Sequence, residues 1–442
     1  MTLAKRRIYL SLLALLFIAG TPLLLFYSRG WRYDIGQGLI LQTGSLTVET
    51  DPQGAEIRIN GEYVGKTPLK ALHYPPGEYL LTLEKENWIL RDQNITIIQG
   101  QATILENISL IVDDSQPVRL LSGSPIHFIS SRDKNSHAIV INENNQESLY
   151  IQRKPTDMPM FIKTFIDENI QQLHWSPNST SLYVVASKPN DSATYSYLFS
   201  DDTMAPIYSP NNQPVKSLYW DNENDKKYYL YTEGRLYNAQ ENVEINVAEH
   251  MLDILIAGNE MYLLRAEDSG ISLSMRDIQT SEELNYVSLS NYQLSNSARL
   301  NLHNNYITIH DTESQIFLVL STFGNIHIIE RDEQFVQNVS WTLEGGQLLL
   351  ANSHEIFTAE TMKEKELLIR YSDVITSPTW QSKNQHVLFI LDSHIHVAEP
   401  KTSPTVVTRL EDIEGLSIST DSSGEYLYAV DTEGLMRYRL LD

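Results

Sequence analysis

Apolar residues are distributed along this chain in two ways, as one long uninterrupted run and then as many short alternating runs. The long run, Ile8 to Tyr27, reads IYLSLLALLFIAGTPLLLFY and contains no charged residue. In a helix such a run spans ~30 Å, the thickness of the hydrocarbon core of a bilayer. Beyond it, apolar and polar residues alternate at period two, the pattern of half-buried β-strands. The pattern therefore predicts an all-β protein behind one membrane-spanning helix.

We expect the apolar run to form a transmembrane helix over residues 8–28 that remains attached to the protein. The basic segment Lys5 to Arg7 precedes it, so the positive-inside rule places residues 1–7 in the cytoplasm and the bulk of the chain outside. Trp31 and Tyr33 follow where an interfacial aromatic belt is expected. These features predict a single-pass protein of the cell membrane that is anchored by its N-terminal helix.

A cleaved signal peptide is the alternative interpretation of the same run. Such a peptide carries an apolar region of ~7–15 residues that ends at a cleavage site with small residues. Here the run is longer, and the small residues Ala19, Gly20 and Thr21 are followed by Pro22 and further leucines. These features favour an uncleaved anchor.

Residues 44–112 are predicted to form a small β-sandwich, separated from the helix by a juxtamembrane linker at 29–43. Alternating segments at Ser45–Thr50 and Ala55–Asn60 flank the turn Asp51-Pro52-Gln53-Gly54, whose Pro and Gly favour tight turns. An Asn-Gly pair, the strongest short hairpin signal, follows. The turn residues on which this prediction depends are Pro52, Gly54, Ala55, Asn60, Gly61, Gly65, Thr67, Pro68, Pro76 and Gly77.

The order of these turns resembles the PEGA domain, in which a P-x-G-A turn, an N-G or D-G hairpin, G-x-T-P and P-G-x-Y follow one another. The corresponding segments here are PQGA from Pro52, NG from Asn60, GKTP from Gly65 and PGEY from Pro76. Gln53 replaces the glutamate of the first motif at a solvated turn. The resemblance implies an extracytoplasmic β-module, often beside a membrane anchor, that acts in surface binding or as a spacer. It implies no catalytic residue.

A repeated unit fills residues 117–442, and we expect it to form a β-propeller. Each unit has an apolar strand that ends in an aromatic residue, then a polar turn and further strands. The unit starts lie about 36–46 residues apart, the period of a four-stranded blade. The units begin at Ile126, Ile170, Val215, Met251, Ser297, Val336, Ile375 and Ile413. The aromatic residues expected to pack between neighbouring blades are Trp175, Trp220, Trp341 and Trp380.

The turn after the aromatic residue, as in WSPNS from Trp175, resembles the W-S-P-D-G hairpin of TolB- and WD40-like propellers. Eight units predict eight blades. Seven blades are the alternative, because the units at Met251 and Ser297 match the repeat only weakly. The last unit supplies three strands, and Pro117 to Leu121 is expected to supply the missing outer strand. Pairing the two ends in this way closes the ring and removes exposed edges.

The net charge and the lack of cysteine exclude some classes of binding partner and of catalytic or metal site. The formal net charge is -23, so a nucleic acid, itself a polyanion, is not expected to bind. The chain has no cysteine, which excludes disulfides, thiolate nucleophiles and zinc–thiolate sites.

We find no catalytic signature, because the chain lacks the G-x-S-x-G, H-E-x-x-H, P-loop and EF-hand patterns. His394 and His396 share one face of a predicted strand with Asp392, but a polar strand face explains them better than a metal site. The turn at Asp421 resembles a sialidase Asp-box only loosely, and a hairpin turn explains it. We expect no cofactor and no metal. The polar residues His303, His310 and Asp311 likewise predict no site.

These observations predict a non-enzymatic, membrane-anchored, extracytoplasmic binding or scaffold protein that presents its propeller to a protein or glycan partner in the cell envelope. The rigid ring of a propeller offers a broad face of variable loops. The alternative is a propeller-based glycan hydrolase or lyase, which requires paired carboxylates about 5–10 Å apart at the central mouth. A third interpretation is an assembly factor that docks on a membrane complex through an exposed apolar patch.

Overall fold

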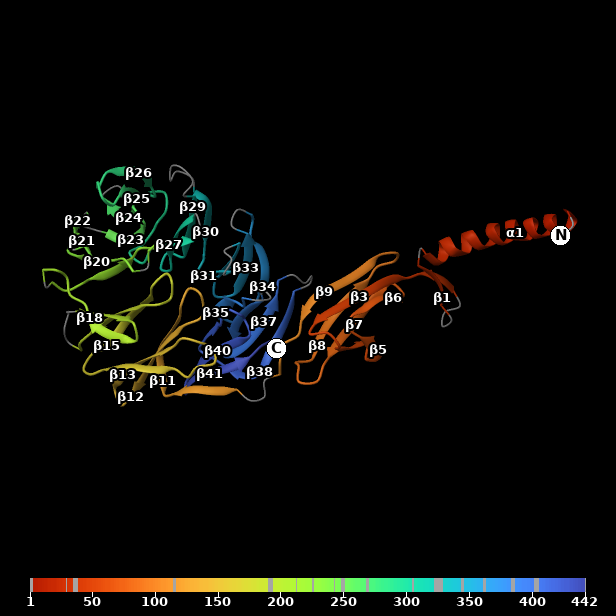
Figure 1. Cartoon of the computed structure of the whole chain (residues 1–442), viewed down its shortest axis with the longest axis horizontal. Helices are drawn as coiled ribbons and strands as arrows, with labels where there is room; N and C mark the ends of the chain where they lie inside the picture. The colour runs from red at the N-terminus through yellow and green to blue at the C-terminus, as the bar shows by residue number, and fades with distance from the viewer. Residues whose placement is uncertain are drawn as a thin grey trace. The chain divides into compact units, whose positions relative to one another are not determined.

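The computed structural model of the chain contains two compact units, Met1–Ser115 with Leu440–Asp442, and Gln116–Arg439 (Figure 1). Strands dominate, and one apolar helix lies at the N-terminus, so the all-β fold class with an N-terminal helix is confirmed. The residues that the structure describes are 3–28, 30–34, 39–113, 117–189, 194–211, 213–224, 226–241, 243–247, 251–267, 270–303, 306–321, 329–342, 346–360, 363–382, 386–400 and 405–441.

The helix α1, Leu3–Ser28, contains the long apolar run. Its segment Tyr9–Ser28 is strongly apolar and has no buried part, so it is long and apolar enough to cross a membrane. The segment 29–43, expected as a linker, contains an antiparallel hairpin of two short strands. These strands are β1 (Trp31–Asp34) and β2 (Leu39–Gln42).

The first unit also contains a small sandwich of a three-stranded and a four-stranded sheet. Their strand orders are β6-β3-β9 and β5-β4-β7-β8, with β3 and β9 parallel. Alternate residues of β3 and β8 are buried, and Leu46, Ile57 and Leu81 meet in the core between the sheets. The strands are β3 (Gly44–Asp51), β4 (Glu56–Ile59), β5 (Glu62–Lys66), β6 (Leu69–Tyr74), β7 (Gly77–Glu84), β8 (Arg91–Ile97) and β9 (Ala102–Ser109).

The second unit is a β-propeller. Its described residues contain eight four-stranded antiparallel sheets, seven of them built from four consecutive strands. Each sheet begins near the start of one of the repeated sequence units. The first four sheets contain β11 (Ser124–Ser130), β12 (His137–Glu143), β13 (Gln146–Gln152) and β14 (Met160–Phe165); β15 (Asn169–Trp175), β16 (Leu182–Ser187), β17 (Thr194–Ser200) and β18 (Thr203–Pro206); β19 (Ser217–Trp220), β20 (Tyr228–Thr232), β21 (Arg235–Asn238) and β22 (Glu244–Asn246); and β23 (Met251–Ala257), β24 (Glu260–Glu267), β25 (Gly270–Asp277) and β26 (Glu283–Ser288).

The remaining four sheets continue in the same order around the propeller (Figure 1). They contain β27 (Arg299–His303), β28 (Tyr306–Asp311), β29 (Ile316–Ser321) and β30 (Ile329–Gln334); β31 (Asn338–Trp341), β32 (Gln347–Ala351), β33 (Glu355–Glu360) and β34 (Glu366–Arg370); β35 (Ile375–Trp380), β36 (Val387–Leu391), β37 (His394–Glu399) and β38 (Val406–Glu414); and β39 (Ser417–Thr420), β40 (Tyr426–Asp431), β41 (Gly434–Arg439) and β10 (Val118–Ser122).

The eighth sheet joins the two ends of the propeller. Its order is β10-β41-β40-β39, so the strand that precedes the first sheet supplies the outer strand of the last one. Val118 is the partner of Arg437 and Ser122 is the partner of Gly434. Pro117 to Leu121, which was expected to supply this strand, overlaps it closely. The pairing joins the ends of the unit without leaving the last sheet one strand short.

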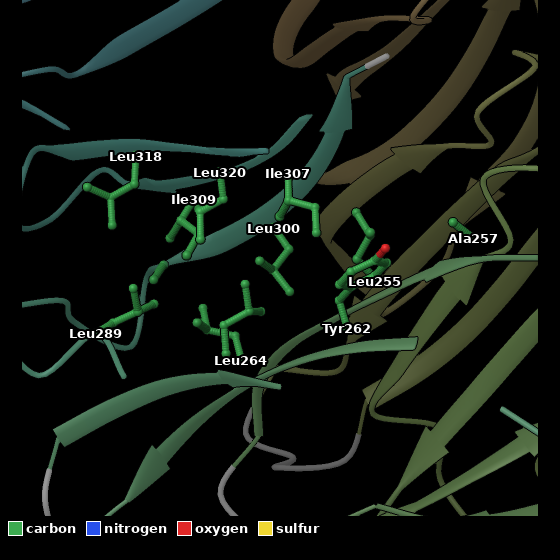
Figure 2. Close-up of a cluster of buried hydrophobic side chains, with 12 residues drawn as sticks. Leu255, Ala257, Tyr262, Leu264, Leu289, Leu300, Ile307, Ile309, Leu318 and Leu320 are labelled. Carbon is green, nitrogen blue, oxygen red and sulfur yellow. The ribbon is translucent and has the colours of Figure 1, made fainter. Parts of the chain in front are cut away.

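Apolar side chains of neighbouring sheets pack against one another and form the core of the ring. Between the fourth and fifth sheets, Leu255 and Leu264 of the fourth meet Leu300, Ile307 and Ile309 of the fifth (Figure 2). Comparable clusters join the first sheet to the second, the second to the third, the third to the fourth, the fifth to the sixth, the sixth to the seventh and the eighth to the first. Since β35 of the seventh sheet lies against β39 of the eighth, the ring is continuous.

Candidate functional site

Thr67 is the centre of the turn network in the small sandwich. Its buried Oγ1 accepts hydrogen bonds from the backbone N–H groups of Gly54 and Ala55, each at 3.1 Å, and lies 2.6 Å from Oγ1 of Thr50. Gly54 has a φ of 89°, which glycine adopts without strain. Each of these contacts is explained by turn geometry and requires no ligand.

The other turn residues predicted for the sandwich lie in its loops and strand ends. Asn60 and Gly61, with φ of 50° and 84°, connect β4 to β5 in the hairpin expected from the Asn-Gly pair. Gly65 lies in β5, and Gly77 begins β7. The prolines at the motif positions are Pro52 and Pro68, each preceded by a cis peptide bond, and Pro76 in the bend before β7.

The four tryptophans expected between blades end the inner strands β15, β19, β31 and β35. Each packs in an apolar cluster that joins its own sheet to the preceding one. These side chains therefore serve inter-sheet packing rather than a binding site. They are Trp175, Trp220, Trp341 and Trp380.

The imidazoles of His394 and His396 are engaged locally in the hairpin of β36 and β37. Nδ1 of His394 lies 2.7 Å from the carbonyl oxygen of Asp392, and Nδ1 of His396 lies 3.2 Å from that of His394. The His396 ring stacks on Phe389 with centroids 5.3 Å apart, and burial lowers its pKa. Among the described residues, no group of three or more His, Asp or Glu side chains is placed to hold a metal ion.

Asp311 and Asp421 each fix a hairpin turn. Asp311 accepts hydrogen bonds from the backbone N–H groups of Glu313 and Ser314, both at 3.1 Å. Although burial opposes the effect, the hydrogen bonds to its carboxylate lower the pKa of Asp311. Asp421 accepts from the backbone N–H of Tyr426 at 2.8 Å in the turn between β39 and β40. Both carboxylates are thus used by the backbone around them.

His303 and His310 are packed inside the propeller. The His303 ring stacks on Trp341 with centroids 4.1 Å apart, and burial lowers its pKa to about 4. Nε2 of His310 lies 3.4 Å from the carbonyl oxygen of Val336, and burial lowers the pKa of this histidine as well. Both rings belong to the packing around the fifth and sixth sheets.

A pocket of about 220 Å³ opens between the fifth and sixth sheets. Its apolar wall consists of Val336, Leu350 and Ala351, beside the rings of Phe335 and Phe357. The segment after β30 supplies one side, and β32 and β33 supply the other. The volume is below the ~300–1,000 Å³ of pockets that enclose whole small molecules. It therefore suits a single bulky side chain.

Phe335 has an unusual conformation for a bulky residue. Its φ is 61°, in the left-handed region, and its side chain is 70% exposed. The chain is held here by the backbone N–H of Val336, which donates to Gln315 at 3.0 Å, and that of Gln337, which donates to Ala351 at 2.9 Å. A strained backbone under an exposed aromatic ring contributes little to folding.

The charged groups at the rim of this pocket are paired within the protein. Nζ of Lys365 lies 2.5 Å from the carboxylate of Glu333. Glu355 accepts hydrogen bonds from Asn352 Nδ2 at 2.9 Å and Arg370 Nε at 2.6 Å, and these bonds, that of Asn352 foremost, lower its pKa. The charged groups at the rim are thus paired within the chain. Val336, Leu350 and Ala351 are buried, so the ring of Phe335 is the main apolar surface that this site exposes.

No sequence-based candidate residue lines the pocket. Its walls come from segments of two neighbouring sheets, which meet through the packing of those sheets. The one available signal was a phenylalanine, followed by one valine, in an otherwise polar stretch between two repeated units, RDEQFVQN from Arg331.

Comparison with solved structures finds many propeller-like neighbours of low identity. The Dos1 propeller shares 12% identity over 74% of this chain and 95% of that chain, with a TM-score of 0.47. A eukaryotic initiation factor shares 11% over 73% and 90%, with a TM-score of 0.46. The uncharacterized protein lmo1340 of Listeria monocytogenes EGD-e shares 11% over 66% and 96%, with a TM-score of 0.42. At these scores the likenesses carry no conclusion about function.

No curated protein matches the chain. Residues 43–107 match the family model described as the PEGA domain, whereas the predicted module spans 44–112. This match confirms the resemblance found in the turn motifs. The small sandwich behind the apolar helix is therefore a PEGA domain, followed along the chain by a β-propeller.

Proposed function

We propose that this chain is a single-pass protein of the cell membrane that holds its propeller outside the cytoplasm as a binding scaffold for a protein partner in the cell envelope. The apolar segment Tyr9–Ser28 supports the anchor, and the adjacent PEGA domain is of an extracytoplasmic type. The basic residues near the N-terminus support a cytoplasmic location for residues 1–7.

The observation that carries the proposal is the pocket between the fifth and sixth sheets. Phe335 is exposed and held in a strained conformation beside an apolar wall. Aromatic anchors next to pockets dominate the binding energy of protein interfaces. A glycan offers mainly hydroxyl groups, whereas Glu355 and Lys365 at the rim are already paired within the chain. This arrangement favours an apolar side chain of a protein over a sugar.

A non-enzymatic role is part of the proposal. A glycan hydrolase needs a carboxylic acid with a raised pKa beside its substrate. The pocket carboxylate Glu355 has a lowered pKa instead. Among the described residues, two carboxylates have raised pKa values. Asp253 is buried between the fourth and fifth sheets, where the N–H groups of Ile254 and Leu300 donate to it. Burial and nearby Glu333 raise the pKa of Asp332, which lies in β30 beside Tyr292 and does not line the pocket. The favoured function is therefore binding.

Photo-crosslinking in cells that express the full chain tests the binding site. A photoreactive phenylalanine analogue is placed at position 335 and, as a matched control, at Phe161, an aromatic residue of β14 that is 54% exposed. We expect one discrete protein adduct from position 335 that position 161 does not give, and that disappears when unlabelled wild-type chain competes. Equal adducts from both positions contradict the site, and an adduct with a glycan contradicts the class of partner.

The orientation is tested separately with single cysteines, since the chain has none of its own. Tyr208→Cys is in the propeller and 63% exposed, and Arg6→Cys is near the N-terminus. A membrane-impermeant maleimide should label position 208 in intact cells and position 6 only after permeabilisation. The reverse result overturns the orientation.

A further inference from the structure

The hairpin of β1 and β2 exposes two large apolar side chains directly after the helix. Tyr33 and Ile40 are cross-strand partners, and they are 64% and 63% exposed. Directly paired residues point to the same face of a two-stranded ribbon. The hairpin therefore presents an aromatic–aliphatic pair without cover from the described residues of the chain.

The base of this hairpin is fastened to the last turn of α1. Arg32 Nη1 donates to the carbonyl oxygen of Tyr27 at 2.7 Å, and its guanidinium lies 3.6 Å from the centroid of the Tyr27 ring. Trp31 meets Phe26 edge to face with centroids 5.9 Å apart. The backbone N–H of Gly30 donates to Tyr27 at 3.2 Å. The first strand is thus held against the end of the helix rather than joined to it by a free linker.

The other end of the hairpin is fastened to the start of the PEGA domain. Thr43 donates to the carbonyl oxygen of Gly30 through both its backbone N–H and its Oγ1, each at 2.8 Å. Thr43 directly precedes β3, and it is buried together with Gly30. These bonds close the base of the hairpin across its two strands.

We propose that this hairpin lies in the headgroup layer of the bilayer, with Tyr33 and Ile40 directed into the lipid. The inference rests on the proposed membrane anchor. Tyr33 follows the end of α1 at Ser28 by five residues, which reach at most ~17 Å. The interfacial layer extends several ångströms beyond the ~30 Å hydrocarbon core, and Trp and Tyr are enriched there. The contacts of Arg32 with Tyr27 and of Trp31 with Phe26 hold the first strand against the last turn of α1, so this layer is the environment next to the pair.

A hairpin seated in this layer has a mechanical consequence. The helix alone leaves the depth of the PEGA domain free, because a single apolar span can slide and tilt. Interfacial aromatic residues set that depth. Tyr33, Ile40 and the Arg32–Tyr27 contact act together as a stop that holds the base of the PEGA domain at the membrane surface.

Depth-dependent quenching in vesicles tests the inference with the full chain. Ile40→Cys carries an environment-sensitive fluorophore, and the variant is reconstituted in phosphatidylcholine vesicles that contain lipids with a quencher either near the headgroup or deep in the acyl chain. Ile104→Cys, a 57% exposed isoleucine of the PEGA domain, is the matched control, and Leu16→Cys within α1 reports the anchor. We expect the label at position 40 to lose most of its fluorescence to the shallow quencher, and the label at 104 to be unaffected.

The outcomes separate this inference from the anchor on which it rests. If the deep quencher acts at position 16 but neither quencher acts at 40, the hairpin does not contact lipid and the inference is wrong while the anchor stands. A label at 40 that is shielded from water yet unquenched indicates a protein contact, which also overturns the inference. Absence of quenching at 16 contradicts the anchor itself. Tyr33→Cys, labelled in the same way, repeats the test if the Ile40 variant folds poorly.

Discussion

The guanidinium of Arg119 donates to the carboxylate of Glu433 at 3.0 Å and to the backbone carbonyl of the same residue at 3.1 Å, although 314 residues separate the two. This contact lies where β10 pairs with β41 and completes the eighth sheet. Leu120, next to Arg119, is buried in the cluster that joins the eighth sheet to the first. The closure thus combines an exposed ion pair with a buried apolar side chain. We expect the buried side chain to contribute more to the free energy of unfolding than the ion pair.

Leu120→Ala should weaken the closure strongly. The change leaves a cavity among Ile139, Tyr428 and Leu435, and such substitutions lower the free energy of unfolding by ~2–5 kcal/mol. Arg119→Ala is the matched control one residue away. Its ion pair is exposed to solvent, so we expect a loss below about 1 kcal/mol. Urea unfolding followed by tryptophan fluorescence measures both, and equal losses contradict this account.

The order of elements could be predicted because alternation and aromatic strand ends are local signals. The weak units at Met251 and Ser297 still form four-stranded sheets, since their strands keep the buried positions and only their turns are degraded. The hairpin of β1 and β2 was missed because LILQ at Leu39–Gln42 does not alternate and is too short for periodicity to detect. The parallel pairing of β3 with β9 joins distant segments, which no local pattern reports.

Thr67→Val should destabilise the PEGA domain at its turn. Valine has a similar shape but no oxygen, so the buried N–H of Ala55 loses its acceptor, at a cost of ~1–3 kcal/mol. Thr67→Ser is the control, because it retains Oγ1. Hydrogen–deuterium exchange over residues 45–60 should become faster in the valine variant and change little in the serine variant. Unchanged exchange in both variants means that Thr67 is not the centre of this network.

The candidate site could not be predicted in the same way. The motif residues that we singled out, such as Thr67 and Trp380, serve turns and packing. The pocket depends on Phe335, Leu350 and Lys365, which lie in different strands or turns and meet only through the packing of two sheets. Neither the left-handed conformation of Phe335 nor the pairing of the nearby charges leaves a sequence pattern.

Phe335→Gly should separate stability from binding. Glycine tolerates the φ of 61° that phenylalanine adopts at a cost of ~1–2 kcal/mol, so the free energy of unfolding should stay the same or rise. Binding of the protein partner should be lost with the ring. Phe335→Leu keeps both the strain and an apolar side chain, so partial binding is expected. Loss of stability together with binding in the glycine variant contradicts a binding role for the ring.

His137 should make the propeller sensitive to acid. Its burial lowers its pKa from 6.5 to about 3, with nearby Lys134 adding to the effect and Asp133 opposing it. Below pH 6.5 His137 therefore becomes protonated in the unfolded chain but stays neutral in the folded chain. The free energy of unfolding falls as the pH falls. Between pH 7 and pH 5 this group removes about 2 kcal/mol.

The His137→Gln variant tests this sign. Glutamine does not titrate, so the dependence of the free energy of unfolding on pH over this window should become shallower, whatever constant loss arises from the contact with Ser130. Urea unfolding at several pH values measures the slope. A slope equal to that of the wild type assigns the acid sensitivity to other groups.

Asp253 should act with the opposite sign. Burial raises its pKa from 3.8 to about 6, against hydrogen bonds from the N–H groups of Leu300 and Ile254 and the charge of Arg299. Between these two values the folded chain binds the proton more tightly than the unfolded chain, so this group favours folding most in acid. Its contribution falls by about 2 kcal/mol from pH 4 to pH 7.

Asp253→Asn removes this titration and leaves an amide that cannot accept both N–H groups, so a constant loss is expected at every pH. On top of that loss, the stability of the variant relative to the wild type should improve from pH 4 to pH 7. Asp277→Asn is the control, because a hydrogen bond from the N–H of Thr280 lowers the pKa of this exposed carboxylate, so its relative stability should change in the opposite direction. If both variants drift in the same direction with pH, Asp253 is not held in the protonated form by its burial.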